Sequence, residues 1–300
     1  MDSPAQPAAG ASAPAGLDGE GRGRLSRALL LGGAALAPLL AAVLARGAAA
    51  PAWPAVHALA EVGALVLGFS TFAVQWHAAG VQGFGDARAR LVGMAALGVA
   101  ALETLHLLLT PGMPGLLREA SPDRALWFWL SARVLGLSAL LAAAGVRRSS
   151  RAPALSRGPL AAAAAALAAA MAGAAWLLPD SSRLFFDGGF TTAWRAAEWA
   201  LAAVAAGGAG LHLRAFRRNA DQASLRLAGA LLLAVLSGVA FALQGSPADA
   251  VAAAGHLYQA GSAWLVFAAC FSAALTRPYE RLDTFLADLA ANHAEVSRLK

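Results

Sequence analysis

The chain has 300 residues, of which 59% are hydrophobic and 13% are charged, and its formal net charge is +6. One soluble core of this length needs far less apolar material, so the composition excludes a soluble domain and predicts an integral membrane protein. The long apolar runs do not alternate with polar residues, which argues against an outer-membrane barrel and predicts an all-α membrane helix bundle. The positive charge is almost all arginine in short islands between these runs, so we expect no nucleic-acid partner.

The first 25 residues are rich in Pro, Ala, Gly and Ser and predict a disordered cytoplasmic tail over 1–25. The apolar stretch that follows is longer than the core of a secretory signal, so we predict an uncleaved first membrane helix. Seven further apolar stretches are long enough for a helix to cross the bilayer, which gives a polytopic domain of eight spans over 26–275. The predicted spans are 28–45, 56–79, 90–110, 125–145, 159–178, 191–213, 225–243 and 250–274.

Basic residues fall mainly on one side of these spans. An even number of spans puts both termini on the same side. If that side is the cytoplasm, 17 basic residues lie inside and four lie outside. Because cytoplasmic loops carry an excess of Arg and Lys, this asymmetry predicts that both termini are cytoplasmic.

Ionisable side chains inside the predicted spans share one depth. Each costs about 2.5–3.5 kcal/mol to insert into hydrocarbon, so each needs a partner or a purpose. Residues three or four apart also share a helix face, as His57 does with Glu61. Folding alone does not require a common depth, so these residues are candidates for ligand binding. All eight lie in the outer half of the membrane: His57, Glu61, Glu103, His106, Arg133, Arg195, Glu198 and His256.

Two interpretations of these residues remain open. In the first, they form salt bridges and interhelical hydrogen bonds that fix the packing of helices otherwise built from Ala and Leu. In the second, they line a pocket open to the outer face. There His57, His106 and His256 hold a metal ion, or two of them hold a haem iron, or the pocket binds an organic ligand. The cofactor is unknown, because the sequence does not show whether the three imidazoles converge.

The other histidines and the glycines carry little signal. His77 and His212 lie at inner span ends and His293 lies in the tail, so we expect these three to be solvated or interfacial. The sequence contains no nucleotide-binding glycine loop, nucleophile elbow or zincin helix, and we therefore expect no enzyme activity in these residues.

Residues 276–300 predict a cytoplasmic signalling helix. Its apolar positions recur at alternating steps of three and four residues if Asn292 fills the missing place: Leu282, Phe285, Leu289, Val296 and Leu299. Such a heptad seam predicts a coiled-coil-like helix and a homodimer through 282–299, although about two and a half heptads are fewer than a secure coiled coil has. The alternative is an amphipathic helix that lies on the membrane surface.

Five short motifs occur in an order that resembles the third type of membrane-associated sensor (MASE) domain of bacterial signalling proteins. Glu103, Trp194, Arg195 and Gln259 stand where that family usually has Asp, Phe, Lys and Lys. The motifs are His57 with Glu61; Glu103 and His106 with Gly112 and Met113; Trp129 with Arg133; Thr192, Trp194, Arg195 and Glu198; and Gly255 and His256 with the exit Arg277-Pro278-Tyr279-Glu280.

This resemblance implies a sensory input module in the bacterial cytoplasmic (inner) membrane. Family members usually precede a histidine kinase, a cyclic-dinucleotide synthase or a ligand-sensing domain, so it also implies a cytoplasmic output domain or a separate output partner. The leading hypothesis is a sensor that detects a ligand or metal in the outer pocket. The alternative is a transporter or a membrane haem- or metal-binding protein, but a transport path needs polar residues in both halves of the bilayer. Beyond Gln75 and Ser237, the inner half has almost none.

Overall fold

The computed structural model describes residues 36–44, 53–79, 86–111, 121–146, 156–178, 183–274 and 276–299, which are almost entirely helical. The tail expected over 1–25 and the Gly112–Met113 pair lie outside the described residues. A short antiparallel hairpin, β1 (Phe185–Phe186) and β2 (Gly189–Phe190), joins α6 to α7. The helices are α2 (Leu36–Leu44), α3 (Trp53–Ala78), α4 (Ala87–Leu109), α5 (Pro122–Gly145), α6 (Arg157–Leu177), α7 (Thr192–Asn219), α8 (Gln222–Leu243), α9 (Ala250–Ala274) and α10 (Thr276–Leu299).

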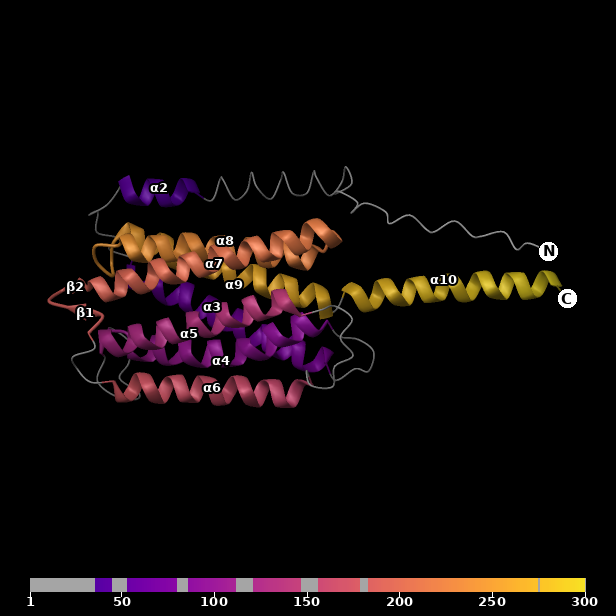
Figure 1. Cartoon of the computed structure of the whole chain (residues 1–300), viewed down its shortest axis with the longest axis horizontal. Helices are drawn as coiled ribbons and strands as arrows, with labels where there is room; N and C mark the ends of the chain where they lie inside the picture. The colour runs from indigo at the N-terminus through magenta and orange to yellow at the C-terminus, as the bar shows by residue number, and fades with distance from the viewer. Residues whose placement is uncertain are drawn as a thin grey trace, which may run out of the picture.

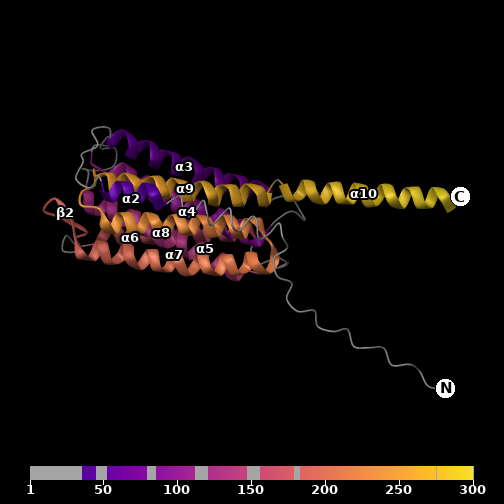
Figure 2. The same cartoon turned by 90° about the horizontal axis from the view of Figure 1, so that it is seen from above.

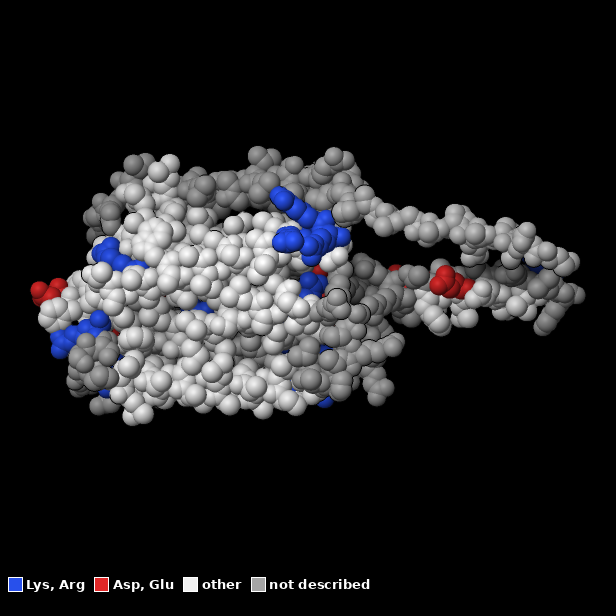
Figure 3. All heavy atoms as spheres, in the orientation of Figure 1, with Lys and Arg blue, Asp and Glu red and all other residues white. Residues whose placement is uncertain are grey.

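Helices α3 to α9 lie side by side in one bundle (Figures 1 and 2). The hairpin lies at one end of this bundle, and α10 leaves from the opposite end. On the face seen in Figure 3, charged atoms gather mostly toward the two ends, whereas the middle is mostly uncharged. This distribution fits a bundle whose middle lies in hydrocarbon. We call the hairpin end the outer end and the α10 end the inner end.

Six of the described helices are long and apolar enough to cross a membrane: α3, α4, α5, α6, α8 and α9. Helix α7 runs alongside them (Figure 1) but carries charged residues near both ends, and α2 has only nine residues. The helical fold is thus confirmed, with six candidate membrane-spanning helices at predicted positions, whereas the count of eight spans stays a prediction.

Local sequence signals explain where the helices begin. The side chain of Asp86 accepts a hydrogen bond from the amide of Arg88 before α4, and Thr191 accepts one from the amide of Trp194 in α7. Such N-caps satisfy amides that lack an intrahelical partner. The hairpin between α6 and α7 was not expected from the sequence. One carboxylate oxygen of Asp123 accepts the amides of Leu184 and Phe185, both at 2.7 Å, and so fixes the hairpin to the start of α5.

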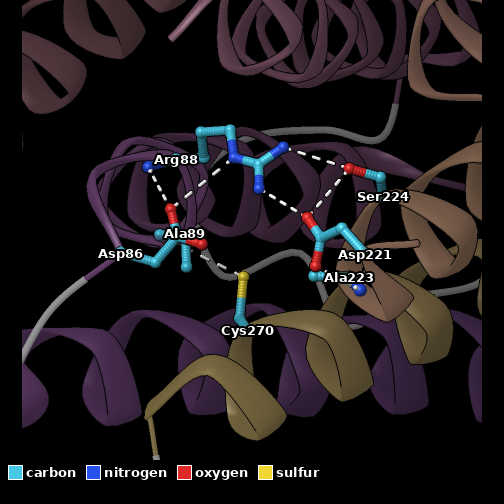
Figure 4. Close-up of polar contacts among 7 residues, drawn as sticks. All are labelled: Asp86, Arg88, Ala89, Asp221, Ala223, Ser224 and Cys270. Atoms are coloured by element: carbon cyan, nitrogen blue, oxygen red, sulfur yellow. Dashed lines mark hydrogen bonds and ion pairs between the residues drawn. The ribbon is translucent and has the colours of Figure 1, made fainter. Parts of the chain in front are cut away.

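The inner end of the bundle contains a buried polar cluster that we had not expected. Arg88 forms an ion pair with Asp221 and donates to Ser224 Oγ at 3.0 Å, which ties α4 to α8 (Figure 4). Close by, Gln75 Nε2 donates to the carbonyl of Cys270 at 2.7 Å and joins α3 to α9. The inner half therefore holds more buried polar groups than we expected, whereas Ser237, which we had placed there, contacts Arg133 nearer the outer end of α8.

The expectation that His212 is solvated or interfacial is wrong. This side chain is fully buried between α7 and α5, and its Nε2 lies 3.0 Å from the carbonyl oxygen of Leu140. Helix α7 continues to Asn219, so the ring lies within the packed part of the helix instead of at its end. His77, by contrast, is exposed.

A close approach between helices explains one glycine. A Cβ atom at Gly98 in α4 would lie 2.8 Å from Leu135 Cδ2 of α5 and 2.9 Å from the carbonyl oxygen of Ala164 in α6. Real Cβ atoms do not come this near to backbone, so any larger residue must push α6 away. Gly63 in α3 has no atom within 4 Å of the same position.

We predict that Gly98→Ala lowers the free energy of unfolding by about 1–3 kcal/mol because it overpacks the contact of α4 with α6. Gly63→Ala is the matched control and should cause no loss, because its methyl group enters open space. Thermal unfolding of both variants in mild detergent measures the difference. Equal melting temperatures for the two variants would contradict the packing described here.

Candidate functional site

Three imidazoles from three helices converge near the outer end of the bundle. The ring centroids of His57 in α3 and His256 in α9 are 4.5 Å apart, and those of His57 and His106 in α4 are 6.1 Å apart. All three line one cavity of about 570 Å³, which we call the outer cavity. The histidines expected in a common pocket are therefore brought together, whereas their role in binding stays a prediction.

The other walls of the outer cavity are largely aromatic. The ring of Trp129 lies 5.1 Å from His106 and 5.4 Å from His256, and Phe241 lies 4.9 Å from His256. Phe185 and Phe190 of the hairpin also line the cavity, so the hairpin contributes to its outer side. A mostly apolar cavity of this size with a few convergent polar groups is typical of small-molecule sites.

Two of the histidines are held by hydrogen bonds on one ring nitrogen. His256 Nδ1 lies 2.7 Å from Glu61 Oε1, and His106 Nδ1 lies 2.8 Å from the carbonyl oxygen of Ala125. The second atoms of these groups, Glu61 Oε2 and His106 Nε2, are buried and have no hydrogen-bond partner among the described residues. Leaving a buried polar atom without a partner costs about 1–3 kcal/mol, so a bound group that satisfied these two atoms would stabilise this part of the bundle.

A buried ion pair lies behind the aromatic wall. Arg133 in α5 is 3.1 Å from Glu198 in α7, and Trp129 Nε1 donates to the other carboxylate oxygen at 3.3 Å. Arg133 also donates to Ser237 Oγ at 3.5 Å and to the carbonyl of Ala234 at 3.4 Å, both in α8. These contacts hold three helices together, and through Trp129 they support the wall that faces the imidazoles.

Glu103 lies at a second, deeper cavity of about 120 Å³. Gln259 Nε2 donates to its carboxylate at 3.4 Å, and Arg133, Thr71 and Ser262 line the same cavity. A cavity of this size with a few polar groups in its wall has room for water molecules near those groups. Glu103 and Arg133 therefore line the deeper cavity, whereas the three imidazoles line the outer cavity.

Arg195 does not point into this cluster. Its guanidinium donates to the carbonyls of Ala242 at 3.0 Å and Gln244 at 3.3 Å, at the end of α8. The last carbonyls of a helix lack intrahelical partners, so Arg195 stabilises the end of α8. Trp129, Phe241 and Gln259 were not among the eight candidate residues, although the family resemblance had named Trp129 and Gln259. The position of Trp129 one turn before Arg133 is the signal that could have found the first.

The donor set suits a divalent transition metal. One ligand atom from each of His57, Glu61 and His256 lies within 4.8 Å of the others, and His106 is not part of this group. Imidazole and carboxylate ligands favour Zn²⁺, Fe²⁺ or related ions. The charges also favour a cation. Arg133 forms an ion pair with Glu198, whereas no ion pair joins Glu61 or Glu103 to an arginine among the described residues.

Comparison with known proteins identifies the class. The chain matches the MASE3 family, described as a membrane-associated sensor domain, over residues 50–278. This match covers most of the chain, which therefore belongs to that family, and it includes all the residues of the site. No curated protein and no solved structure matches the chain.

We predict that Arg133→Ala and Glu198→Ala each lower the free energy of unfolding by about 3–5 kcal/mol, because each leaves one buried charge without its partner. The double variant Arg133→Met with Glu198→Leu should be closer to the native chain than either single variant, since it removes both charges together. Thermal unfolding in detergent checks this order. If the double variant loses as much free energy of unfolding as the two single variants added together, the ion pair between Arg133 and Glu198 is contradicted.

Proposed function

We propose that this chain is the sensory input module of a bacterial signal-transduction protein. It binds a ligand or a metal ion in the outer cavity and passes the occupancy of that cavity to a cytoplasmic output through α9 and α10. The observation that carries this proposal is that one helix, α9, contributes His256 to the outer cavity and leads directly to α10. The chain belongs to a membrane-associated sensor family, which supports the same function.

The contacts of α9 give the proposed signal a route. At the outer end α9 is joined to α3 by the contact of His256 with Glu61, and at the inner end by the hydrogen bond of Gln75 to the carbonyl of Cys270. Between them, Gln259 contacts Glu103 of α4, and Ser262 donates to the carbonyl of Ala230 in α8. A ligand that alters the contact between His256 and Glu61 therefore acts on α9, and the inner end of α9 leads to α10.

The proposed placement follows from the charges. We propose eight spans in the bacterial inner membrane with both termini in the cytoplasm, since basic residues are concentrated at one side. The outer cavity with its three imidazoles then lies near the outer side of the membrane, and α10 extends into the cytoplasm. An output domain or partner would receive the signal there.

The proposed dimer rests on α10. Three of its apolar residues are largely exposed in the single chain: Phe285 at 62%, Leu289 at 55% and Val296 at 53%. They lie at heptad spacing on a helix that projects away from the bundle (Figure 2), so a second copy of α10 can cover them. We therefore propose a parallel homodimer through 282–299.

We predict that single cysteines at the seam crosslink two chains. In a Cys270→Ala background, Phe285→Cys, Leu289→Cys and Val296→Cys should form disulfide-linked dimers, because seam positions face each other in a parallel pair. Ala287→Cys, also exposed but off the seam, is the control and should crosslink less. Crosslinking to the same extent at every position would favour a helix on the membrane surface.

We predict that the outer cavity controls an output domain attached to α10. In a fusion of the whole chain to a cyclic-dinucleotide synthase domain, His57→Ala and His256→Ala should change product formation about tenfold, within the usual range of coupling between sites. His77→Ala, an exposed histidine on α3, is the control. The substrate GTP is cytoplasmic, so a working fusion also requires a cytoplasmic C-terminus.

Unchanged product formation in both cavity variants, at equal protein levels, would contradict the proposed sensory function. A second fusion, with alkaline phosphatase at the same point, tests the orientation, because that enzyme works only outside the cytoplasm. An inactive synthase fusion together with an active phosphatase fusion would contradict a cytoplasmic C-terminus.

A further inference from the structure

Two buried polar atoms belong to the imidazole cluster: one is in His106, which lines the outer cavity, and the other is in Glu61, which contacts the cavity-lining His256. Glu61 is 2% exposed and His106 is 5% exposed, and Glu61 Oε2 and His106 Nε2 form no hydrogen bond with the described residues. Glu61 Oε2 lies beside His256, because His256 Nδ1 is hydrogen-bonded to Oε1 of the same carboxylate. A bound group at this place would satisfy atoms that the protein alone leaves unpaired.

The distances identify the kind of group. Two donors bound about 2.1 Å from one tetrahedral ion are roughly 3.4 Å apart. The ligand atoms of His57, Glu61 and His256 already lie within 4.8 Å of one another, so only small side-chain movements would bring them to one ion. The 2.7 Å contact of Glu61 with His256 shows that these two donors already adjoin.

The charge of the cluster also favours a cation. Three carboxylates lie in this region, from Glu61, Glu103 and Glu198, and the ion pair with Arg133 compensates only the last. Burial disfavours the ionised form of Glu61 and Glu103, and a divalent ion beside Glu61 would favour it. Buried charges in a bilayer require such compensation.

We infer that His57, Glu61 and His256 form a mononuclear site for a divalent transition-metal ion at the wall of the outer cavity. Two imidazoles and one carboxylate leave further coordination positions open, as in sites that bind exogenous molecules. These positions face the cavity, because His57 and His256 both line it. His106 lies at the same cavity outside the ligand group, where its Nε2 can hydrogen-bond to what the ion holds.

This inference rests on the proposed function and deepens it: the ion makes the outer cavity a place where a small coordinating molecule, or the ion itself, is detected. It also changes the expected ligand set, since Glu61 takes the place that we had assigned to His106.

The test is metal binding by the full-length chain in mild detergent after removal of metals by a chelator. Titration with Co²⁺, read by its visible absorbance, and with Zn²⁺, read by metal analysis, should give one ion per chain. His57→Ala, Glu61→Gln and His256→Ala should each weaken binding at least tenfold. His106→Ala, a histidine of the same cavity, is the control and should keep one ion per chain.

Thermal unfolding shows whether a variant is folded. Zn²⁺ should raise the melting temperature of the native chain and of His106→Ala but not that of the three ligand variants, although each of them still unfolds cooperatively. Absence of Co²⁺ and Zn²⁺ binding by the native chain would overturn the inference. Loss of binding in His106→Ala with full binding in Glu61→Gln would overturn the ligand set.

The output fusion separates this inference from the proposed function. If the native chain binds no metal while His57→Ala still changes the output, the metal site is wrong and the sensor stands. If the metal binds as described and the output ignores every cavity variant, the site stands and the sensory function is wrong.

Discussion

The hydrogen bond between Glu61 and His256 is the contact on which the arrangement of the outer half depends. It joins α3 to α9 across 195 residues of sequence, and both side chains are buried. A carboxylate in hydrocarbon must find a partner, so this pairing fixes how α3 and α9 face each other. That arrangement in turn places His57 against His256 and defines one wall of the outer cavity.

The rest of the bundle forms a frame around that contact. Arg133 and Glu198 link α5 to α7 behind Trp129, while Arg88 and Asp221 link α4 to α8 at the inner end. Most other contacts between the helices involve Ala, Gly and Leu, which allow close approach but give little directional preference. The few polar contacts therefore decide which helices face each other, and α9 is the element that runs from the outer cavity to α10.

Much of the fold could be predicted from the sequence, because bilayer thickness dictates the length of an apolar helix. Helices α3 to α9 lie where apolar runs were found, and the shared depth of the buried histidines and carboxylates predicted which residues to examine. Which side chains pair was not predictable, because the hydrogen bond between Glu61 of α3 and His256 of α9 depends on how the helices pack. The hairpin and the buried Arg88 were missed for a related reason, because both depend on contacts with distant parts of the chain, namely Asp123 and Asp221.

The central claim is that the contacts at the outer cavity set the position of α10. The most direct measurement is the distance between spin labels at Asn219, at the inner end of α7, and Ala287 in α10, in a Cys270→Ala background diluted with unlabelled chain. Comparing the native cavity with His256→Ala, we predict a shift of about 2–5 Å in that distance, the range of helix movements in known switches. Identical distance distributions for the two proteins would contradict the claim.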